Sequence, residues 1–237
     1  MNKESRMPAA VLWDMDGTLV DTEPYWIASE FELATRHAGQ WTNEHAMSLV
    51  GKDLLDAGRY IRQHMGIDVT PERIVEEMLD GVIARIQQGV PWRPGALELL
   101  TTLRIAGVRC ALVTMSYRRL VTPILEHLHP GSFQAVVTGD MLERGKPHPE
   151  PYLTAAMALG VAAGDCVAIE DSPTGVLSAE AAGCAVLVVE NHVRVDPGPR
   201  RTFRESLAVT TLADLCALFQ DGRTISAPAT PCSPQTA

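Results

Sequence analysis

The stretch VLWDMDGTLVDTE, residues 11–23, decides the fold of this chain. It is a short apolar run that ends in two aspartates, Asp14 and Asp16, followed by a glycine and a threonine. Carboxylates beside a buried segment are costly to desolvate unless they are paired, hydrogen-bonded or bound to a cation. The rest of the chain must therefore supply partners for two like charges at the end of a buried strand.

Composition and charge describe an ordinary globular chain. It has 237 residues, 46% hydrophobic and 21% charged, which is enough for one large domain with an insertion. The formal net charge of −9 argues against a nucleic-acid partner, because such proteins usually carry a basic surface. No apolar run reaches the roughly 18 to 20 residues of a membrane helix, and the start does not resemble a signal peptide. We therefore expect a cytoplasmic protein with a small-molecule partner and no nucleic-acid or membrane partner, a monomer by default with a dimer as the alternative.

Short apolar runs alternate with helix-like segments, a pattern typical of parallel strands joined by helical crossovers. The predicted strands are AAVLWD (9–14), RCALVT (109–114), FQAVVT (133–138), CVAIED (166–171) and CAVLVVE (184–190). Three helical segments between them end in a residue favoured just past a helix, namely Gly107, Gly160 and Gly183. These patterns predict an α/β fold built on a doubly wound, Rossmann-like parallel sheet.

The stretch between the first predicted strand and Pro94 shows no strand pattern. It contains instead three helical patterns, at residues 23–39, 53–66 and 70–89. Thr70 and Pro71 give the last of these a capping residue and a proline at the first helical position. Crossovers are usually much shorter than this stretch, so we interpret it as a separate helical subdomain. The predicted domains are a core at 8–23 and 93–222, this helical subdomain at 24–92, and a disordered tail at 223–237 that is rich in proline and small polar residues.

Polar residues follow the predicted strands at the edge where open α/β sheets bind ligands. They are Asp14 and Asp16 after the first strand, Thr114 and Ser116 at the second, Lys146 beyond the third, and Glu170 and Asp171 at the fourth. Carboxylates gathered at one edge repel one another without a cation, and Mg²⁺ takes oxygen ligands while it binds substrate phosphate. A carboxylate in this position can attack phosphorus, and a carboxyl two residues further on can give or take a proton.

Four segments, in this order, make the chain resemble the phosphatase and phosphomutase branch of the haloacid dehalogenase superfamily. They are DMDGTLVDTE (14–23), LVTMS (112–116), GKPHPEPY (145–152) and IEDSPTG (169–175). A lone pair of aspartates would be weak evidence, whereas the ordered set is specific. The resemblance implies an enzyme, a Mg²⁺-dependent phosphomonoester hydrolase that acts on a small phosphorylated metabolite such as a sugar phosphate. It also implies that the helical segment 24–92 is an inserted cap, which closes over the site and excludes water.

The resemblance also implies roles for the residues that match the motifs. Asp14 would be the nucleophile that forms an aspartyl-phosphate, and Asp16 would be the general acid that protonates the leaving group and then activates water. Both aspartates would contact the phosphoryl group. Thr114, Met115 and Lys146 would bind its oxygens, and Lys146 would also steady Asp14.

The same resemblance implies a Mg²⁺ site. The ion would be held by the Asp14 carboxylate, by the backbone carbonyl of Asp16 and by Asp171. Glu170 would be a further ligand, or would support the ligands through hydrogen bonds.

Several alternatives to hydrolysis stay open to different degrees. Haloacid dehalogenases lack the second aspartate, so the presence of Asp16 disfavours dehalogenation. Phosphonoacetaldehyde hydrolases use a cap lysine at a position that we align with Leu54. β-Phosphoglucomutases resemble the chain closely, but they carry a histidine and an arginine where this chain has Trp26 and Leu54, so we rank the mutase second. A receiver-like or non-catalytic phospho-acceptor module is the alternative from another class, although receivers are much shorter and have no inserted cap.

Overall fold

Six short strands form one sheet in the order β3-β2-β1-β4-β5-β6, and every neighbouring pair is parallel. The structure is a computed structural model that describes residues 7–50 and 52–224. The strands are β1 (Ala10–Trp13), β2 (Arg109–Val113), β3 (Ala135–Val137), β4 (Cys166–Glu170), β5 (Ala185–Val188) and β6 (Arg201–Phe203). The order places β1 between β2 and β4, and the predicted doubly wound α/β fold is confirmed.

The five predicted strands are all present, and β6 is an addition that the sequence pattern missed. β6 has three half-buried residues, Arg201, Thr202 and Phe203, and it lies at the edge of the sheet beside β5. An edge strand this short buries no apolar run, so it leaves no period that could be recognised in the sequence.

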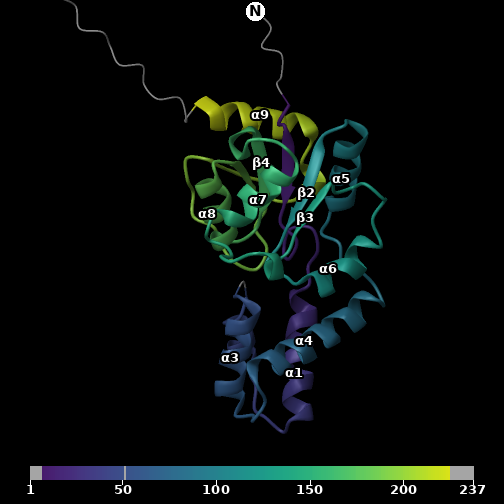
Figure 1. The fold of residues 1–237 in the computed structure, drawn as a ribbon, viewed down its shortest axis with the longest axis vertical. Helices are drawn as coiled ribbons and strands as arrows, with labels where there is room; N and C mark the ends of the chain where they lie inside the picture. The colour runs from purple at the N-terminus through teal and green to yellow at the C-terminus, as the bar shows by residue number, and fades with distance from the viewer. Residues whose placement is uncertain (1–6, 51, 225–237) are drawn as a thin grey trace, which may run out of the picture.

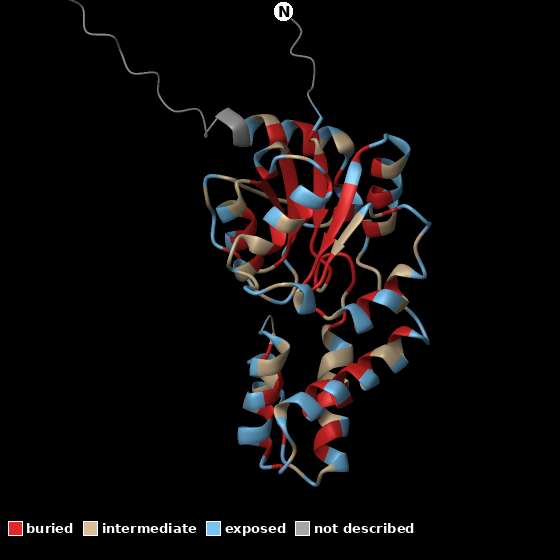
Figure 2. Ribbon diagram, in the orientation of Figure 1, coloured by how far each residue is buried: buried red, intermediate tan, exposed pale blue. Residues whose placement is uncertain are grey.

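Helices cover both faces of the sheet (Figure 1). One face packs against α5 (Ala96–Ile105), α6 (Arg118–Leu125) and α9 (Leu212–Thr224), and the other against α7 (Glu150–Ala158) and α8 (Pro173–Ala182). Residues along β1 alternate between the two cores, because successive side chains of a strand point to opposite faces. Val11 and Trp13 belong to the first core, and Ala10 and Leu12 to the second. Figure 2 shows these strands as the most continuously buried part of the molecule.

Glycines end the crossover helices as the sequence predicted. Gly107, Gly160 and Gly183 all have positive φ angles, of 71°, 67° and 99°, which side chains with a Cβ rarely adopt. Short 3₁₀ turns complete the connections, at Gly139–Met141, Ala163–Asp165 and Leu207–Val209. Helix α9 runs through Thr224, two residues into the segment predicted as a disordered tail, and the remainder of that segment, 225–237, lies outside the described residues.

The insertion after β1 folds into four helices, which we call the cap. They are α1 (Glu23–Arg36), α2 (Asn43–Met47), α3 (Leu54–Met65) and α4 (Pro71–Ile86). Thr70 caps α4 by accepting a hydrogen bond from the Arg73 backbone N–H, and Pro71 is its first residue, as predicted. The short helix α2 was not predicted, because five residues are too few to show a helical period.

A buried carboxylate ties two cap helices together. Glu77 on α4 accepts hydrogen bonds from Arg36 and His37 at the end of α1 and from Arg73 one turn away on α4. Burial raises the pKa of Glu77, but these three donors outweigh it and lower the pKa to about 2. Beneath this network the cap has its own core, formed by Leu33, Ile61, Met65, Ile74, Met78 and their neighbours.

Two paired segments carry the chain from the core into the cap and back. Val20 and Trp92 form an antiparallel bridge, and the Asp21 N–H donates to the carbonyl of Pro91 at 2.8 Å. The arrangement is that of a two-stranded hinge, with the cap beyond one edge of the sheet (Figure 1). The predicted domain limits fall beside this pair of segments, and they stay a prediction.

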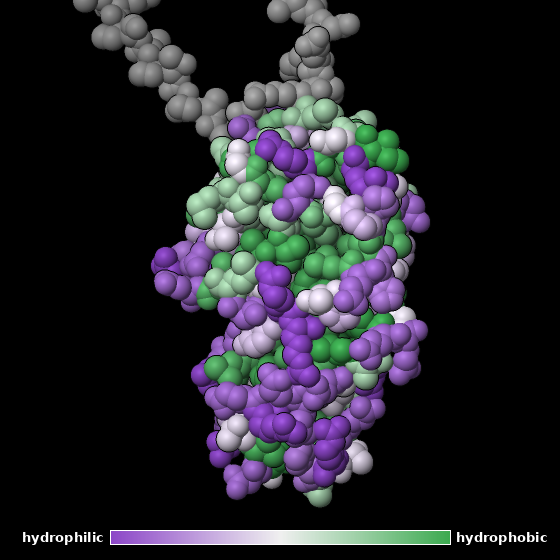
Figure 3. Space-filling model, turned by 45° about the vertical axis from the view of Figure 1, so that its right-hand side comes forward, coloured by the Kyte–Doolittle hydropathy of each residue, from purple (hydrophilic) through white to green (hydrophobic). Residues whose placement is uncertain are grey.

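The surface differs between the two parts. Figure 3 shows that the face of the cap in view is mostly hydrophilic and that apolar side chains gather mainly on the core. Within the described residues, no helix has the length and apolar character that spanning a membrane requires.

Candidate active site

The parallel sheet brings the predicted residues together because of its strand order. β1, β4 and β2 lie side by side and point the same way, so the residues just past them meet at one edge. Asp14 follows β1, Thr114 follows β2, and Asp171 follows Glu170, the last residue of β4. Asp16 and Met115 lie at the same edge, and Lys146 reaches it from the loop before α7.

Lys146 is the centre of a buried ionic network. Its Nζ donates to Asp14 Oδ1 and Glu170 Oε1, both at 2.6 Å, and to the Val113 carbonyl at 3.1 Å. The Lys146 side chain is 5% exposed. Burial alone would lower its pKa, but the Asp14 and Glu170 carboxylates raise it above its ordinary value, so Lys146 is a fixed positive charge.

Glu170 supports this network rather than facing open space. It is fully buried, and its Oε1 accepts from Lys146 and from the Tyr152 hydroxyl at 2.6 Å. Its Oε2 accepts from the backbone N–H groups of Asp171 and Ser172 and from the Ser172 hydroxyl. Both oxygens are therefore occupied by protein donors, which fixes the position of Lys146.

Asp14 has a different arrangement, because only one of its oxygens is satisfied. Lys146 binds Oδ1, while Oδ2 is buried and has no hydrogen-bond partner among the described residues. Burial and the neighbouring Glu170 raise the pKa of Asp14 to about 7, although Lys146 opposes this shift. An unpartnered buried carboxylate oxygen requires a compensating ligand.

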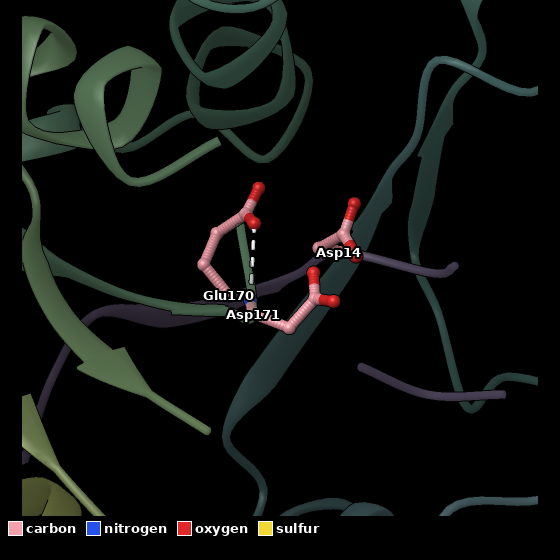
Figure 4. A group of neighbouring side chains, drawn as sticks. All are labelled: Asp14, Glu170 and Asp171. Atoms are coloured by element: carbon pink, nitrogen blue, oxygen red, sulfur yellow. Dashed lines mark hydrogen bonds between the residues drawn. The ribbon is translucent and has the colours of Figure 1, made fainter. Parts of the chain in front are cut away.

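Asp171 completes a cluster of oxygens that could hold a cation. Carboxylate oxygens of Asp14, Glu170 and Asp171 lie within 4.8 Å of one another. In Figure 4 the Asp171 side chain extends toward Asp14, whereas Glu170 turns back to accept from the Asp171 backbone. Burial, followed by Asp14 and Glu170, raises the pKa of Asp171 well above its ordinary value. The free oxygen of Asp14 and this all-oxygen donor set fit a hard divalent cation such as Mg²⁺.

Two glycines of the motifs are explained by their closeness to these carboxylates. Gly17 has a φ of +90°, and a Cβ there would overlap the Asp171 carboxylate. Gly175, in the first turn of α8, leaves no room for a Cβ beside the Glu170 carboxylate. Both positions therefore require glycine for space, and Gly17 requires it for its backbone angle as well.

Asp16 accepts hydrogen bonds from hydroxyl groups through both oxygens of its carboxyl group. Thr22 Oγ1, at the start of the cap, donates to Asp16 Oδ1 at 2.6 Å. Ser116 Oγ and Thr114 Oγ1 donate to Asp16 Oδ2 at 2.8 and 3.0 Å. The Asp16 carboxyl thus lies beside Asp14 without sharing its ionic network, and it connects the hinge with the end of β2.

A cavity of about 380 Å³ lies between these residues and the cap. Asp14, Asp16, Thr114, Lys146 and Asp171 line it on the core side. The cap side is mostly apolar, with contributions from Trp26, Leu49, Leu54, Ile61, Ile74, Val75 and Met78. A volume in this range is typical of small-molecule sites.

Several residues of the site were missed or undervalued by the sequence reasoning. Thr22 is part of the first motif, but its role depends on where α1 begins, which the pattern leaves uncertain. The sequence predicts Ser116 at this edge of the sheet, but gives it no role of its own. Tyr152 ends the segment GKPHPEPY, yet its bond to Glu170 depends on tertiary contacts. Glu30 gave no signal, since only tertiary contacts bring it to the cavity.

Comparison with known proteins agrees with the motif reading. A family model described as haloacid dehalogenase-like hydrolase matches residues 11–189. Hexitol phosphatase A of Escherichia coli (strain K12) is 34% identical over 180 residues, which cover 75% of this chain and 81% of that protein. Phosphoglycolate phosphatase 1 of Pseudomonas aeruginosa is 31% identical, covering 89% and 79%. Among solved structures, CbbY of Rhodobacter sphaeroides in complex with a xylulose bisphosphate has a TM-score of 0.80 at 26% identity, covering 88% of this chain and 99% of that one.

Proposed function

The chain belongs to the haloacid dehalogenase-like hydrolase family, with phosphatases among its relatives, and from that premise we propose that it hydrolyses small phosphomonoesters through an aspartyl-phosphate on Asp14. The observation that carries the proposal is the Asp14 carboxylate, with one oxygen fixed by Lys146 and the other unpartnered at the edge of the cavity. A carboxylate held in this way is oriented for attack on a substrate that enters the cavity.

In the first step the free oxygen of Asp14 attacks phosphorus, and the bond from phosphorus to the ester oxygen breaks. Asp16, two residues on, gives its proton to the departing alkoxide. In the second step Asp16 takes a proton from water, the water oxygen attacks phosphorus, and inorganic phosphate leaves as the Asp14 carboxylate re-forms. Lys146 stabilises the negative charge that develops on the phosphoryl oxygens, together with the Met115 backbone N–H. The Thr114 hydroxyl, which donates to Asp16 in this structure, would turn to donate to a phosphoryl oxygen when substrate binds.

The cation is part of the proposal. Asp14, Asp171 and the backbone carbonyl of Asp16 would hold Mg²⁺, which would supply positive charge to neutralise the phosphate and the carboxylates. Glu170 belongs to the same acidic cluster, but because both of its oxygens are occupied by protein donors, we assign it the positioning of Lys146. The all-oxygen donor set favours a hard divalent cation over softer metal ions, and we propose Mg²⁺ among the hard cations because the resemblance to the family implies it.

The partner is proposed to be a small phosphorylated metabolite, with neither nucleic acid nor membrane involved and the chain acting as a cytoplasmic monomer. Relatives named for hexitol and phosphoglycolate phosphatase activity support small phosphomonoesters as substrates. The mutase ranks second, because Trp26 and Leu54 line the cavity at the positions where mutases carry histidine and arginine. Apolar side chains there offer no group to hold a sugar bisphosphate.

Phosphate release from p-nitrophenyl phosphate and from a panel of phosphorylated metabolites tests the proposal. The purified chain, freed of metal with EDTA, should be inactive and should recover multiple turnovers with Mg²⁺. The panel includes β-glucose phosphate with its bisphosphate, on which net isomerisation would favour the mutase instead. One equivalent of bound phosphate without turnover would identify a phospho-acceptor module and contradict the enzyme.

A further inference from the structure

Glu30 is a buried carboxyl in the cap that the proposed reaction does not use. It lies on α1, is 2% exposed and lines the cavity. Trp41 Nε1 donates to Glu30 Oε2 at 2.9 Å, and within the described part of the chain this is its only hydrogen bond. The other oxygen, Oε1, has no protein donor among the described residues and is not one of the fully enclosed unpartnered atoms, so it is open to the cavity and can accept from a ligand there.

The surroundings of Glu30 are apolar. The cavity wall near it is formed by Trp26, Ile61, Ile74, Val75 and Met78. Burial raises the pKa of Glu30 to about 7, although the Trp41 hydrogen bond opposes the shift. The cap lines the cavity with three other charged side chains, Glu23, Lys52 and Asp53, and Glu23 lies two turns before Glu30 on α1. A few polar groups within a mostly apolar wall are the usual composition of a site that orients a small ligand.

Glu30 lies at the end of the cavity remote from Asp14. The Thr22 hydroxyl, just before α1, binds Asp16 beside the nucleophile. Since an α-helix rises about 1.5 Å per residue, Glu30 lies about 12 Å further along α1 than Thr22. A substrate with its phosphate at Asp14 would therefore extend its other end toward Glu30.

Most of the cationic residues of the cavity already contact carboxylates. Among the described lining residues the cations are Lys52, Lys146 and His192, with no arginine. Lys146 and His192 contact carboxylates, whereas the exposed Lys52 ammonium lies 4.6 Å from the centre of the Tyr60 ring. A second anionic group that reached Glu30 would thus meet a carboxylate, and Lys52 is the one cation of the described lining for which no carboxylate partner is seen.

We propose that Glu30 and the apolar wall around it bind the end of the substrate remote from the phosphate, and that they select an uncharged hydroxylated end over a second anion. This inference rests on the phosphatase activity proposed above. A substrate hydroxyl donates to Oε1, whereas a carboxylate or second phosphate offers only acceptors and a like charge. The carbon chain of the substrate packs against the wall.

The ratio of two specificity constants tests the proposal. We would measure kcat/KM for a hexitol phosphate, whose far end is a hydroxyl, and for the corresponding hexonate phosphate, which has the same number of carbons and a carboxylate there. The wild-type chain should favour the hexitol phosphate by about 100-fold or more, because a site built around one hydrogen-bonding group discriminates strongly. The ratio is informative because partial unfolding lowers both rates equally.

Glu30→Gln should lower this ratio by about tenfold or more, since the amide still accepts from Trp41 but can donate to the carboxylate. The matched control is Glu32→Gln on the same helix, because Glu32 pairs with Arg85 and its side chain is 55% exposed. The control should keep the wild-type ratio. Circular dichroism and thermal unfolding establish that both variants are folded.

A wild-type preference for the hexonate phosphate would overturn the inference, whatever the variants do. An unchanged ratio in folded Glu30→Gln would overturn it as well. Turnover of p-nitrophenyl phosphate with neither hexose derivative cleaved would refute the inference and leave the phosphatase standing. Failure to release phosphate from any substrate with Mg²⁺ would instead overturn the proposed function.

Discussion

Replacing Lys146 with methionine should destabilise the metal-free protein by about 3 kcal/mol. The change keeps most of the apolar stem but removes an ammonium group that binds Asp14, Glu170 and the Val113 carbonyl. Removing one partner of a buried ion pair costs about 3–5 kcal/mol, because the remaining charge is left without compensation. We expect the lower end of this range. The pKa of Asp14 is already about 7 and rises further without Lys146, so Asp14 takes up a proton and avoids a bare charge.

Urea unfolding in EDTA, followed by circular dichroism, measures this effect. With an m-value of about 3 kcal/mol per molar urea for a chain of this size, the midpoint should fall by about 1 M. The matched control is Lys52→Met, since Lys52 is exposed and its ammonium lies over the face of Tyr60, so its loss should lower the free energy of unfolding by less than about 1 kcal/mol. Equal urea midpoints for wild type and Lys146→Met would refute the inference that the positive charge of Lys146 compensates the buried carboxylates of Asp14 and Glu170.

The remaining predictions concern four other positions. Asp14→Asn should reduce turnover of p-nitrophenyl phosphate to background, because the nucleophile is lost. The thermal midpoint in EDTA should be no lower than that of the wild type, because a buried charge is lost as well. Retained activity would contradict the assignment of Asp14 as the nucleophile. Asp16→Ala should lower kcat/KM about 100-fold or more for an alkyl phosphate. For the nitrophenyl ester, whose leaving group needs no proton, the factor by which kcat/KM falls should be at least about ten times smaller. Equal factors for the two substrates would assign Asp16 a structural role. Glu77→Gln should lower the free energy of unfolding by about 1–2 kcal/mol at neutral pH, a value discounted because the arginine partners are exposed. The pKa of Glu77 is about 2 in the folded chain and 4.5 in the unfolded chain, so the difference in thermal midpoint between variant and wild type should disappear as the pH falls from 4.5 toward 2. A difference that stays constant over this range would be evidence against the ionic network. Gly17→Ala should lower the thermal midpoint more than Gly107→Ala, because both have positive φ but only Gly17 has a carboxylate in the way of a Cβ; equal midpoints would show that the space beside Asp171 does not matter.

The sequence predicts the core of the sheet and the placement of its polar residues well, for a physical reason. Asp14, Thr114 and Asp171 each follow a strand that is buried on both faces, and such strands appear as apolar runs that are easily recognised. Once the sheet is parallel, its geometry alone brings the strand ends together. The roles assigned to these residues still await the experiments described above.

Other features could not be predicted, because their cause is not local. β6 and α2 are too short to show a period, and their positions depend on neighbours that precede or follow them by many residues. The partners of Glu170 include Tyr152 from α7, which nothing in the motif around Glu170 indicates. Glu30 appears in the sequence as one polar residue on an amphipathic helix, and its burial follows only from the packing of α1 against α4.

This difference between core and cap explains why the chemistry of the chain is easier to infer than its substrate. The reacting groups require fixed positions, and short motifs at the ends of buried strands provide them, so sequence patterns identify the reaction. The far end of the cavity is built from single side chains on α1, α3 and α4, none of which belongs to a motif. A change at one such position, such as Leu54 or Glu30, would alter the wall of the cavity and leave the reacting groups in place. Specificity in this fold can therefore diverge through a few cap residues while the reaction is retained.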